Sequence, residues 1–287
     1  DMSRGLGDVY KRQDIIDEIR SINATVPIVL TDIPDPSPTP DIISDHPDAS
    51  RRAVVSNIVI ELNQQLSNLA TSRGLTFARV SHLTDMLKAT DPIYIGGIEM
   101  IKDKDPTREN RPLYLYCKEG LHPSTNGQAI LTNILIDAIN SATGATIPNL
   151  PNRVIIESLL GLNPDQPFID WLAAKGITQI SMLLDSDGDG IPNLGEYLLG
   201  LEPLVADAVH ISSTQWIDGA AKLTMTYKTD TNAARLANVL IKQSTNLTDW
   251  SLVPEENIHL LPDGHKQVRL PMDQDGLYTR MEFELLP

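Results

Sequence analysis

The first half of the chain alternates between continuous apolar runs and apolar residues at helical spacing. Residues 26–31 are apolar almost throughout, which is typical of a strand buried on both faces of a parallel sheet. A long helix follows, with Asp48 or Ser50 as its N-cap and Gly74 as its end. Its apolar stripe consists of Val54, Val55, Ile58, Leu62, Leu66, Leu69 and Ala70. This strand and helix predict the repeating unit of an α/β domain.

The same alternation continues to about residue 147. Residues 14–21 have the pattern of the end of a helix, with three isoleucines on one face. Three further stretches are predicted strands: residues 75–80, 93–101 and 113–116. A second long helix starts near Thr125, whose spacing to Gln128 is that of a capping box. We therefore predict an α/β domain of three layers over residues 14–147.

The second half of the chain changes character twice. Residues 148–205 contain mostly helical pieces around one acidic loop, and residues 206–287 contain short strands separated by turns such as Pro262-Asp263-Gly264. The predicted strands cover residues 222–227, 239–242, 266–270 and 281–285. We predict a helical linker followed by a small all-β domain that resembles a sandwich.

Composition and charge restrict the possible partners. The chain has 287 residues, 41% of them hydrophobic, which is enough for two cored domains. With 38 acidic and 23 basic residues the net charge is −15, which disfavours nucleic acid and anionic membranes as partners. No apolar run reaches the ~18 residues of a membrane span, and the single cysteine excludes an internal disulfide. We expect a monomer.

The acidic loop at residues 185–196 has the spacing of a twelve-position calcium loop, with Gly190 at the position of the sharp turn. The predicted ligands are the carboxylates of Asp185, Asp187 and Asp189, the carbonyl of Ile191, the side chain of Asn193 and the carboxylate of Glu196. The alternative is a solvated acidic loop. Because only one such loop is visible, we expect a structural calcium clip and not a sensor switch.

The last third of the chain resembles secreted bacterial proteins. Residues 185–203 are similar to their EF-hand-like, thrombospondin type 3-like calcium repeats. Residues 243–250, Gln-Ser-Thr-Asn-Leu-Thr-Asp-Trp, resemble the β tail that follows such repeats in Verrucomicrobia-type proteins. The resemblance implies a secreted or cell-surface protein.

A second motif lies at residues 119–123, Glu-Gly-Leu-His-Pro, directly before the helix that starts near Thr125. It resembles the last motif of SGNH (GDSL-type) hydrolases, normally Asp-x-x-His-Pro, and the match extends over residues 14–147. The resemblance implies a three-layer, flavodoxin-like domain in which His122 is the general base and Glu119 orients it. Glutamate in place of the family's aspartate changes the reach of this contact.

The chemistry of the motif agrees with that role. A general base must be neutral near the working pH and must carry its proton on the correct ring nitrogen. An acid three residues away can accept from one ring nitrogen and leave the other facing a nucleophile. The alternatives are that His122 is a capping or surface histidine and that Glu119 is a solvated charge.

The nucleophile is not visible in the sequence. The chain contains neither a Gly-Asp-Ser motif nor a Gly-x-Asn-Asp motif, both of which lie near the amino end of the family's domain. Ser124 has the pattern of a helix-start residue. Residues 1–13 resemble the translation of a sequencing adapter, so we expect that the domain is incomplete at its amino end and that this chain is inactive.

The first functional hypothesis is therefore an ester hydrolase that acts on acyl or acetyl esters of small molecules or polysaccharides. It predicts that His122 lies at the carboxyl edge of the parallel sheet, next to a stiff loop with prolines at 34, 36, 38 and 40. The rival hypothesis is a non-catalytic, calcium-stabilised surface or carbohydrate-binding protein. Trp216 and Trp250 could stack on sugar rings in such a protein, but we expect them to pack in the β-domain core.

Overall fold

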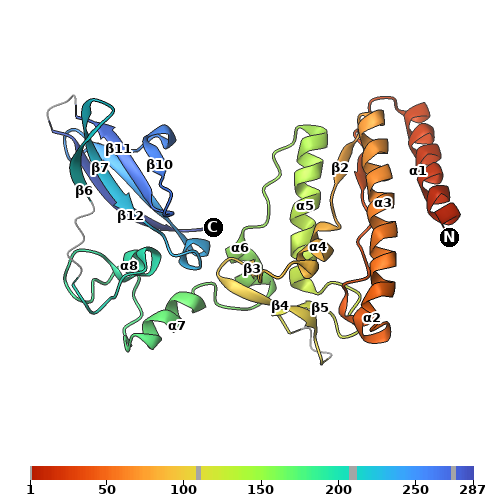
Figure 1. The fold of residues 1–287 in the computed structure, drawn as a ribbon, viewed down its shortest axis with the longest axis horizontal. Helices are drawn as coiled ribbons and strands as arrows, with labels where there is room; N and C mark the ends of the chain where they lie inside the picture. The colour runs from red at the N-terminus through yellow and green to blue at the C-terminus, as the bar shows by residue number, and fades with distance from the viewer. Residues whose placement is uncertain (1, 108–110, 207–211, 273–275) are drawn as a thin grey trace. The chain divides into compact units, whose positions relative to one another are not determined.

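A computed structural model describes residues 2–107, 111–206, 212–272 and 276–287 (Figure 1). Its helices and small sheets make it a mixed α/β structure, as the sequence predicted at this level. The chain divides into two units, one of Asp1–Ile95 with Glu99–Leu162 and one of Gly96–Ile98 with Asn163–Pro287. Within the described part of the chain, no helix combines the length and apolar character needed to cross a membrane.

The first unit consists of helices and two small sheets. Its helices are α1 (Met2–Ile22), α2 (Pro40–Asp45), α3 (Ala49–Arg73), α4 (His82–Lys88), α5 (Thr125–Thr143) and α6 (Asn152–Val154), followed by a π-helical turn at Ile155–Leu159. Its strands are β1 (Val29–Thr31), β2 (Thr76–Ala78), β3 (Ile93–Ile95), β4 (Ile98–Lys104) and β5 (Tyr114–Tyr116). Strands β1 and β2 pair in parallel, as do β4 and β5, with β3 at the other edge of β4. Helices α3 and α5 lie on either side of β2 (Figure 1).

Helix α3 begins and ends where the sequence predicts. Asp48 is its N-cap, and the side chain of Asp48 accepts hydrogen bonds from the backbone N–H groups of Ser50 at 2.9 Å and Arg51 at 3.4 Å. Gly74 ends the helix in the left-handed conformation, with φ of 62°. Both signals act within a few residues, so they do not depend on the rest of the fold.

The predicted apolar stripe of α3 is only partly correct. Leu66, Leu69 and Ala70 are buried in a core with Ile16 and Leu30. In contrast, Val54 and Val55 are 59% and 43% exposed. A three-residue strand is about 10 Å long, whereas a helix of 25 residues is about 38 Å long, so the short β1–β2 sheet covers only part of the helix.

Three other local predictions are wrong. Ile15 and Ile19 are 55% and 36% exposed, so only the middle isoleucine of the predicted face of α1 is buried. Pro40 starts α2, where its fixed φ suits the first helical position, although we predicted a loop there. Ser124, not Thr125, is the N-cap residue of α5, and no side-chain capping bond forms, so the predicted capping box is absent.

The second unit contains two antiparallel sheets and two helices, α7 (Gln166–Ala174) and α8 (Asn193–Leu199). The strands are β6 (Ser212–Ile217), β7 (Ala220–Tyr227), β8 (Ala237–Ser244), β9 (Ser251–Leu252), β10 (Ile258–Leu260), β11 (Lys266–Pro271) and β12 (Tyr278–Leu285). One sheet has the order β10-β11-β7-β6 and the other β12-β8-β9. Met225 and Val268 of the first sheet share a core with Ile241 of the second. The four predicted strands are therefore present, and each extends beyond its predicted bounds.

Helices α7 and α8 pack against the strands and not as a separate linker. Phe168, Leu172 and Leu198 are fully buried in one cluster with Ala237 of β8. The approach of α8 to β12 is so close that a Cβ added to Gly195 would lie 2.5 Å from the ring of Phe283. The unit boundary between residues 162 and 163 falls inside the segment 148–205 that we expected to be the linker.

Candidate functional site

Three loops meet at the carboxyl ends of the strands in the first unit. Together they line a cavity of about 290 Å³. Its apolar wall includes Pro34 and Pro36 after β1, Val80 and Leu83 after β2, and Tyr116 and Leu121 at the end of β5. Burial raises the pKa of Tyr116 to about 12, so this phenol is neutral at ordinary pH. The arrangement is a small apolar cavity with a mouth formed by loops.

His122 and Glu119 lie on the loop after β5. The Nδ1 atom of His122 is 2.6 Å from Oε1 of Glu119, and the same oxygen accepts the backbone N–H of His122 at 2.8 Å. Partial burial would raise the pKa of Glu119, but these two hydrogen bonds outweigh it and lower that pKa below its usual value. The side chains are 76% and 46% exposed. The pair predicted from the motif therefore forms, with a charged carboxylate on one ring nitrogen.

The loop that carries this pair is held against the start of α2. The carbonyl of Gly120 accepts the backbone N–H of Asp41 at 3.2 Å, and Cys117 N–H donates to the His122 carbonyl at 3.0 Å. Gly120 has φ of 83°, and an added Cβ would lie 2.8 Å from the Asp41 nitrogen. Leu121 and Pro123, the neighbours of His122, line the cavity together with Pro34 and Pro36 of the loop that follows β1. The strand that precedes His122, β5, belongs to the sheet of β3 and β4 and not to that of β1 and β2.

The loop after β1 is fixed by buried polar contacts that the sequence analysis missed. Asp32 is 4% exposed, and its carboxylate accepts the backbone N–H of Ser81 at 2.8 Å and the hydroxyl of Ser81 at 2.5 Å. Asn63 of α3 bonds both the N–H and the carbonyl of Ile33, at 2.9 and 2.8 Å. The available signal was an aspartate directly after a buried strand, because such a residue meets the ends of neighbouring strands.

A second buried carboxylate, Asp35, pairs with Lys88 at 2.6 Å and accepts the hydroxyl of Ser56 at 2.6 Å. Burial would raise the pKa of Asp35, but the contacts with Lys88 and Ser56 lower it overall. Lys88 also donates to the Ser56 hydroxyl at 3.0 Å. Lys88 is thus a hydrogen-bond donor to both partners, whereas a serine–lysine catalytic pair needs a lysine that accepts the serine proton. This trio is therefore structural and does not form a serine–lysine catalytic pair.

Neither of the two nucleophilic side chains next to His122 fits catalysis. Ser124 is 6% exposed and its hydroxyl donates to the Tyr114 carbonyl at 2.5 Å, in keeping with a helix-start residue. Burial and the Glu119 carboxylate raise the pKa of the Cys117 thiol, which keeps it in its unreactive form. We therefore assign no nucleophile.

The predicted calcium loop brings three of its ligands together. Oxygen atoms of Asp185, Asp187 and Asp189 lie within 4.8 Å of one another. The Asp185 carboxylate accepts the backbone N–H groups of Gly190 at 2.8 Å and Gly188 at 2.7 Å, and these bonds lower its pKa. These contacts hold the loop in a turn around the three carboxylates.

The other three predicted ligands, Ile191, Asn193 and Glu196, lie outside this group of three carboxylates. Glu196 is fully buried in the first turn of α8. Asn193 is also fully buried, but its amide accepts the Ser186 hydroxyl at 2.9 Å and donates to the Ser181 carbonyl at 3.2 Å. The side chain of Asn193 therefore braces the loop, and its role as a calcium ligand stays a prediction. The backbone N–H of Ile191 donates to the carboxylate of Asp189 at 2.8 Å.

The prediction that both tryptophans pack in the β core is wrong. Trp216 on β6 is 76% exposed. Trp250 lies under Arg280, whose guanidinium is 4.2 Å from the ring centroid, and its indole N–H donates to the Leu247 carbonyl at 3.1 Å. The core between the sheets is built from smaller side chains together with Tyr227.

The chain was compared with known proteins at three levels. Comparisons with protein-family models, with curated proteins and with solved structures find no match.

Proposed function

We propose that the first unit is part of the catalytic domain of an ester hydrolase of the SGNH type, with a flavodoxin-like, three-layer architecture. The observation that carries the proposal is the 2.6 Å contact between His122 and Glu119, on a loop beside an apolar cavity at the strand ends. Catalytic groups of parallel α/β domains are found at this edge. His122 is the general base, and Glu119 is its orienting acid.

The mechanism follows from the two ring nitrogens of His122. Glu119 accepts a hydrogen bond from the N–H group at Nδ1, which leaves Nε2 to take a proton from a serine hydroxyl as that oxygen attacks the ester carbonyl. Nε2 then returns the proton to the leaving alcohol, and a second cycle with water releases the acid and restores the serine. The carboxylate stabilises the imidazolium formed in between. We assign no serine to this role, and we propose that the 287-residue chain alone is inactive.

The cavity beside His122 suggests the kind of ester. The wall formed by Pro34, Pro36, Val80 and Leu83 is apolar, so it suits the hydrocarbon part of an acyl group. The substrates proposed are acyl or acetyl esters of small molecules or polysaccharides. No cationic side chain lines this cavity among the described residues, which disfavours a strongly anionic acyl group.

The second unit is proposed as a calcium-stabilised, sandwich-like module of a secreted or cell-surface protein. Asp185, Asp187 and Asp189 supply three carboxylates that would repel one another without a cation, and hard cations prefer such oxygen ligands. The buried Glu196 would complete the site as the last residue of the loop. Calcium would then fix the loop relative to α8 and would take no part in ester hydrolysis.

The proposal is tested with the complete reading frame that encodes this chain, using p-nitrophenyl acetate as substrate. His122→Ala should lower kcat/KM by about 10²–10⁴-fold. Glu119→Gln should lower kcat strongly, whereas Glu119→Asp should retain more activity. His46→Ala, which removes an exposed histidine of the same unit, is the matched control. Equal activity of the His122→Ala and His46→Ala proteins would refute the proposal.

The pair can also be tested in the present chain, without turnover. Nitrogen-15 NMR of the His122 ring should show the proton on Nδ1 at a pH where the ring is neutral, because the Glu119 carboxylate accepts a hydrogen bond from that N–H group. Glu119→Gln should abolish this preference. A neutral ring protonated mainly on Nε2 would contradict the assigned roles.

A further inference from the structure

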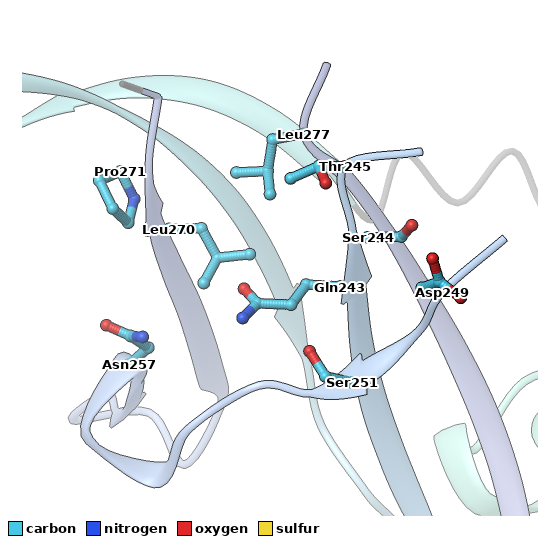
Figure 2. A pocket seen from close by; sticks show the side chains of 9 residues that line it. All are labelled: Gln243, Ser244, Thr245, Asp249, Ser251, Asn257, Leu270, Pro271 and Leu277. Carbon is cyan, nitrogen blue, oxygen red and sulfur yellow. The ribbon is translucent and has the colours of Figure 1, made fainter. Parts of the chain in front are cut away.

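A separate cavity of about 320 Å³ lies in the second unit. Figure 2 shows the Gln243 side chain reaching into it, with Leu270 and Leu277 on one side and Ser251 on the other. Asn257 and Asp249 lie at opposite ends of this group in Figure 2. Gln243 belongs to β8 and Leu270 to β11, so the two sheets both contribute to the cavity.

The side chains around this cavity select the chemistry of a ligand. Two amides, three hydroxyls and a carboxylate offer both donors and acceptors, whereas Leu277 and the almost fully buried Leu270 form the apolar part of the lining. Among the residues that the structure describes, none lining the cavity is a lysine or arginine, so an anionic ligand would meet only the charge of Asp249. A neutral molecule with many hydroxyls and one apolar face fits this lining best.

The loop that carries Asp249 is held in place before any ligand binds. Asn246 accepts the N–H groups of Thr248 at 2.9 Å and Asp249 at 2.8 Å, and its own amide donates to the Asp249 carboxylate at 2.7 Å. Leu247 has φ of 65°, which is unusual for a residue that is not glycine. Binding to an already ordered loop costs less conformational entropy than ordering it on contact.

An exposed aromatic ring extends the same face of the sheet. Trp216 of β6 pairs with Ala221 of β7, whose carbonyl accepts the backbone N–H of Met272 at 3.4 Å. Leu270 precedes Met272 by two residues, so both lie on one face of the sheet, and Trp216 shares that face through the register. The 76% exposure of Trp216 leaves its ring available to the apolar face of a sugar.

We propose that this cavity binds one unit of a neutral saccharide chain, and that Trp216 contacts a neighbouring unit. The amides and hydroxyls bond the sugar hydroxyls, while Leu277 covers a C–H face. The proposal does not depend on ester hydrolysis. It gives the second unit a binding activity that could bring a polysaccharide to the chain.

The test is calorimetric titration of the whole 287-residue chain with cellohexaose, xylohexaose and mannohexaose, with hexagalacturonic acid as the anionic comparison. At least one neutral hexasaccharide should bind with Kd between about 10 μM and 1 mM, and more tightly than the anionic one. Gln243→Leu and Asn257→Leu should each weaken that binding about five- to tenfold. Gln215→Leu, on an exposed position of β6, should not.

Two further measurements keep the test decisive. Bound hexasaccharide should protect Trp216 from quenching by iodide. If Gln243→Leu does not fold, Ser251→Ala at an exposed position of the same cavity replaces it. His122→Ala should bind the sugar with unchanged affinity, which separates this proposal from that of ester hydrolysis. Absence of binding to all three neutral sugars at about 10 mM, or tighter binding of the anionic one, would overturn the proposal.

Discussion

Replacement of Gly120 tests how the loop of His122 and Glu119 is held. With φ of 83°, Gly120 adopts a left-handed conformation, and an added Cβ would lie 2.8 Å from both the Asp41 nitrogen and Cδ of Lys104. Gly144 at the end of α5 has a similar φ of 70°, but no described atom lies within 4 Å of an added Cβ there. The variants Gly120→Ala and Gly144→Ala therefore share the backbone strain and differ in the steric clash.

The magnitudes can be estimated separately. Alanine in the left-handed region costs about 1–2 kcal/mol, which both variants should show. Displacement of packed atoms adds about 1–3 kcal/mol, and only Gly120→Ala should show it, because backbone atoms of α2 cannot move as easily as a side chain. The melting temperature of Gly120→Ala should therefore lie about 2–12 °C below that of Gly144→Ala.

The assay follows the two units separately. The three longest helices, α1, α3 and α5, belong to the first unit, so far-ultraviolet circular dichroism reports mainly its unfolding. The three tryptophans, Trp171, Trp216 and Trp250, belong to the second unit, and their fluorescence should melt as in the unmodified chain. Equal losses of stability in the two alanine variants would show that the Gly120–Asp41 approach is not close, and the placement of His122 would then lose its support.

Three other outcomes are expected. Lys88→Met should move acid unfolding of the helical signal to higher pH. The folded-state pKa of Asp35 lies below 3.8, so the stability that Asp35 contributes is present above that value and is lost as the pH falls through the folded pKa. Loss of Lys88 raises this folded pKa, so the stability is lost at a higher pH. An unchanged acid midpoint would argue against the ion pair. EDTA should lower the melting temperature of the tryptophan signal by about 5–10 °C relative to calcium at a hundred times its Kd, and Glu196→Gln should remove this difference. An identical melt with and without calcium would eliminate the structural role of the metal. The purified 287-residue chain should hydrolyse p-nitrophenyl acetate no faster than its His122→Ala variant, and His122-dependent turnover would contradict the absence of a nucleophile.

Features set by a few neighbouring residues could be predicted from the sequence. Asp48 and Gly74 determine the ends of α3 through contacts within one turn of helix. The turn at Pro262-Asp263-Gly264 is present for the same reason, with φ of 84° at Gly264. The Glu119–His122 contact spans only three residues, so the motif was sufficient to predict it.

Burial could not be predicted as well, because it depends on which elements lie opposite. Val54 follows the helical period of α3 but is 59% exposed, since strands of three residues are too short to cover the whole helix. Trp216 follows the strand period of β6 and lies on the face of Leu270, yet it is exposed because β6 is the edge strand of its sheet.

The His122 side chain is 76% exposed, so what can separate the proposed base from a surface histidine is the loop structure around it. A surface histidine needs no specific support, yet the loop after β1, beside His122, is fixed by Asn63 on the backbone of Ile33 and by the Thr84 hydroxyl on the N–H of Asp35 at 3.1 Å. These contacts join residues 30 and 49 positions apart, so no local motif could reveal them. Burying polar groups is favourable only when they are paired, and these contacts pair the backbone of the loop after β1 with side chains of α3 and α4. Several buried hydrogen bonds to one loop are typical of a site that must keep its geometry. They favour the proposed hydrolase over the surface-histidine interpretation.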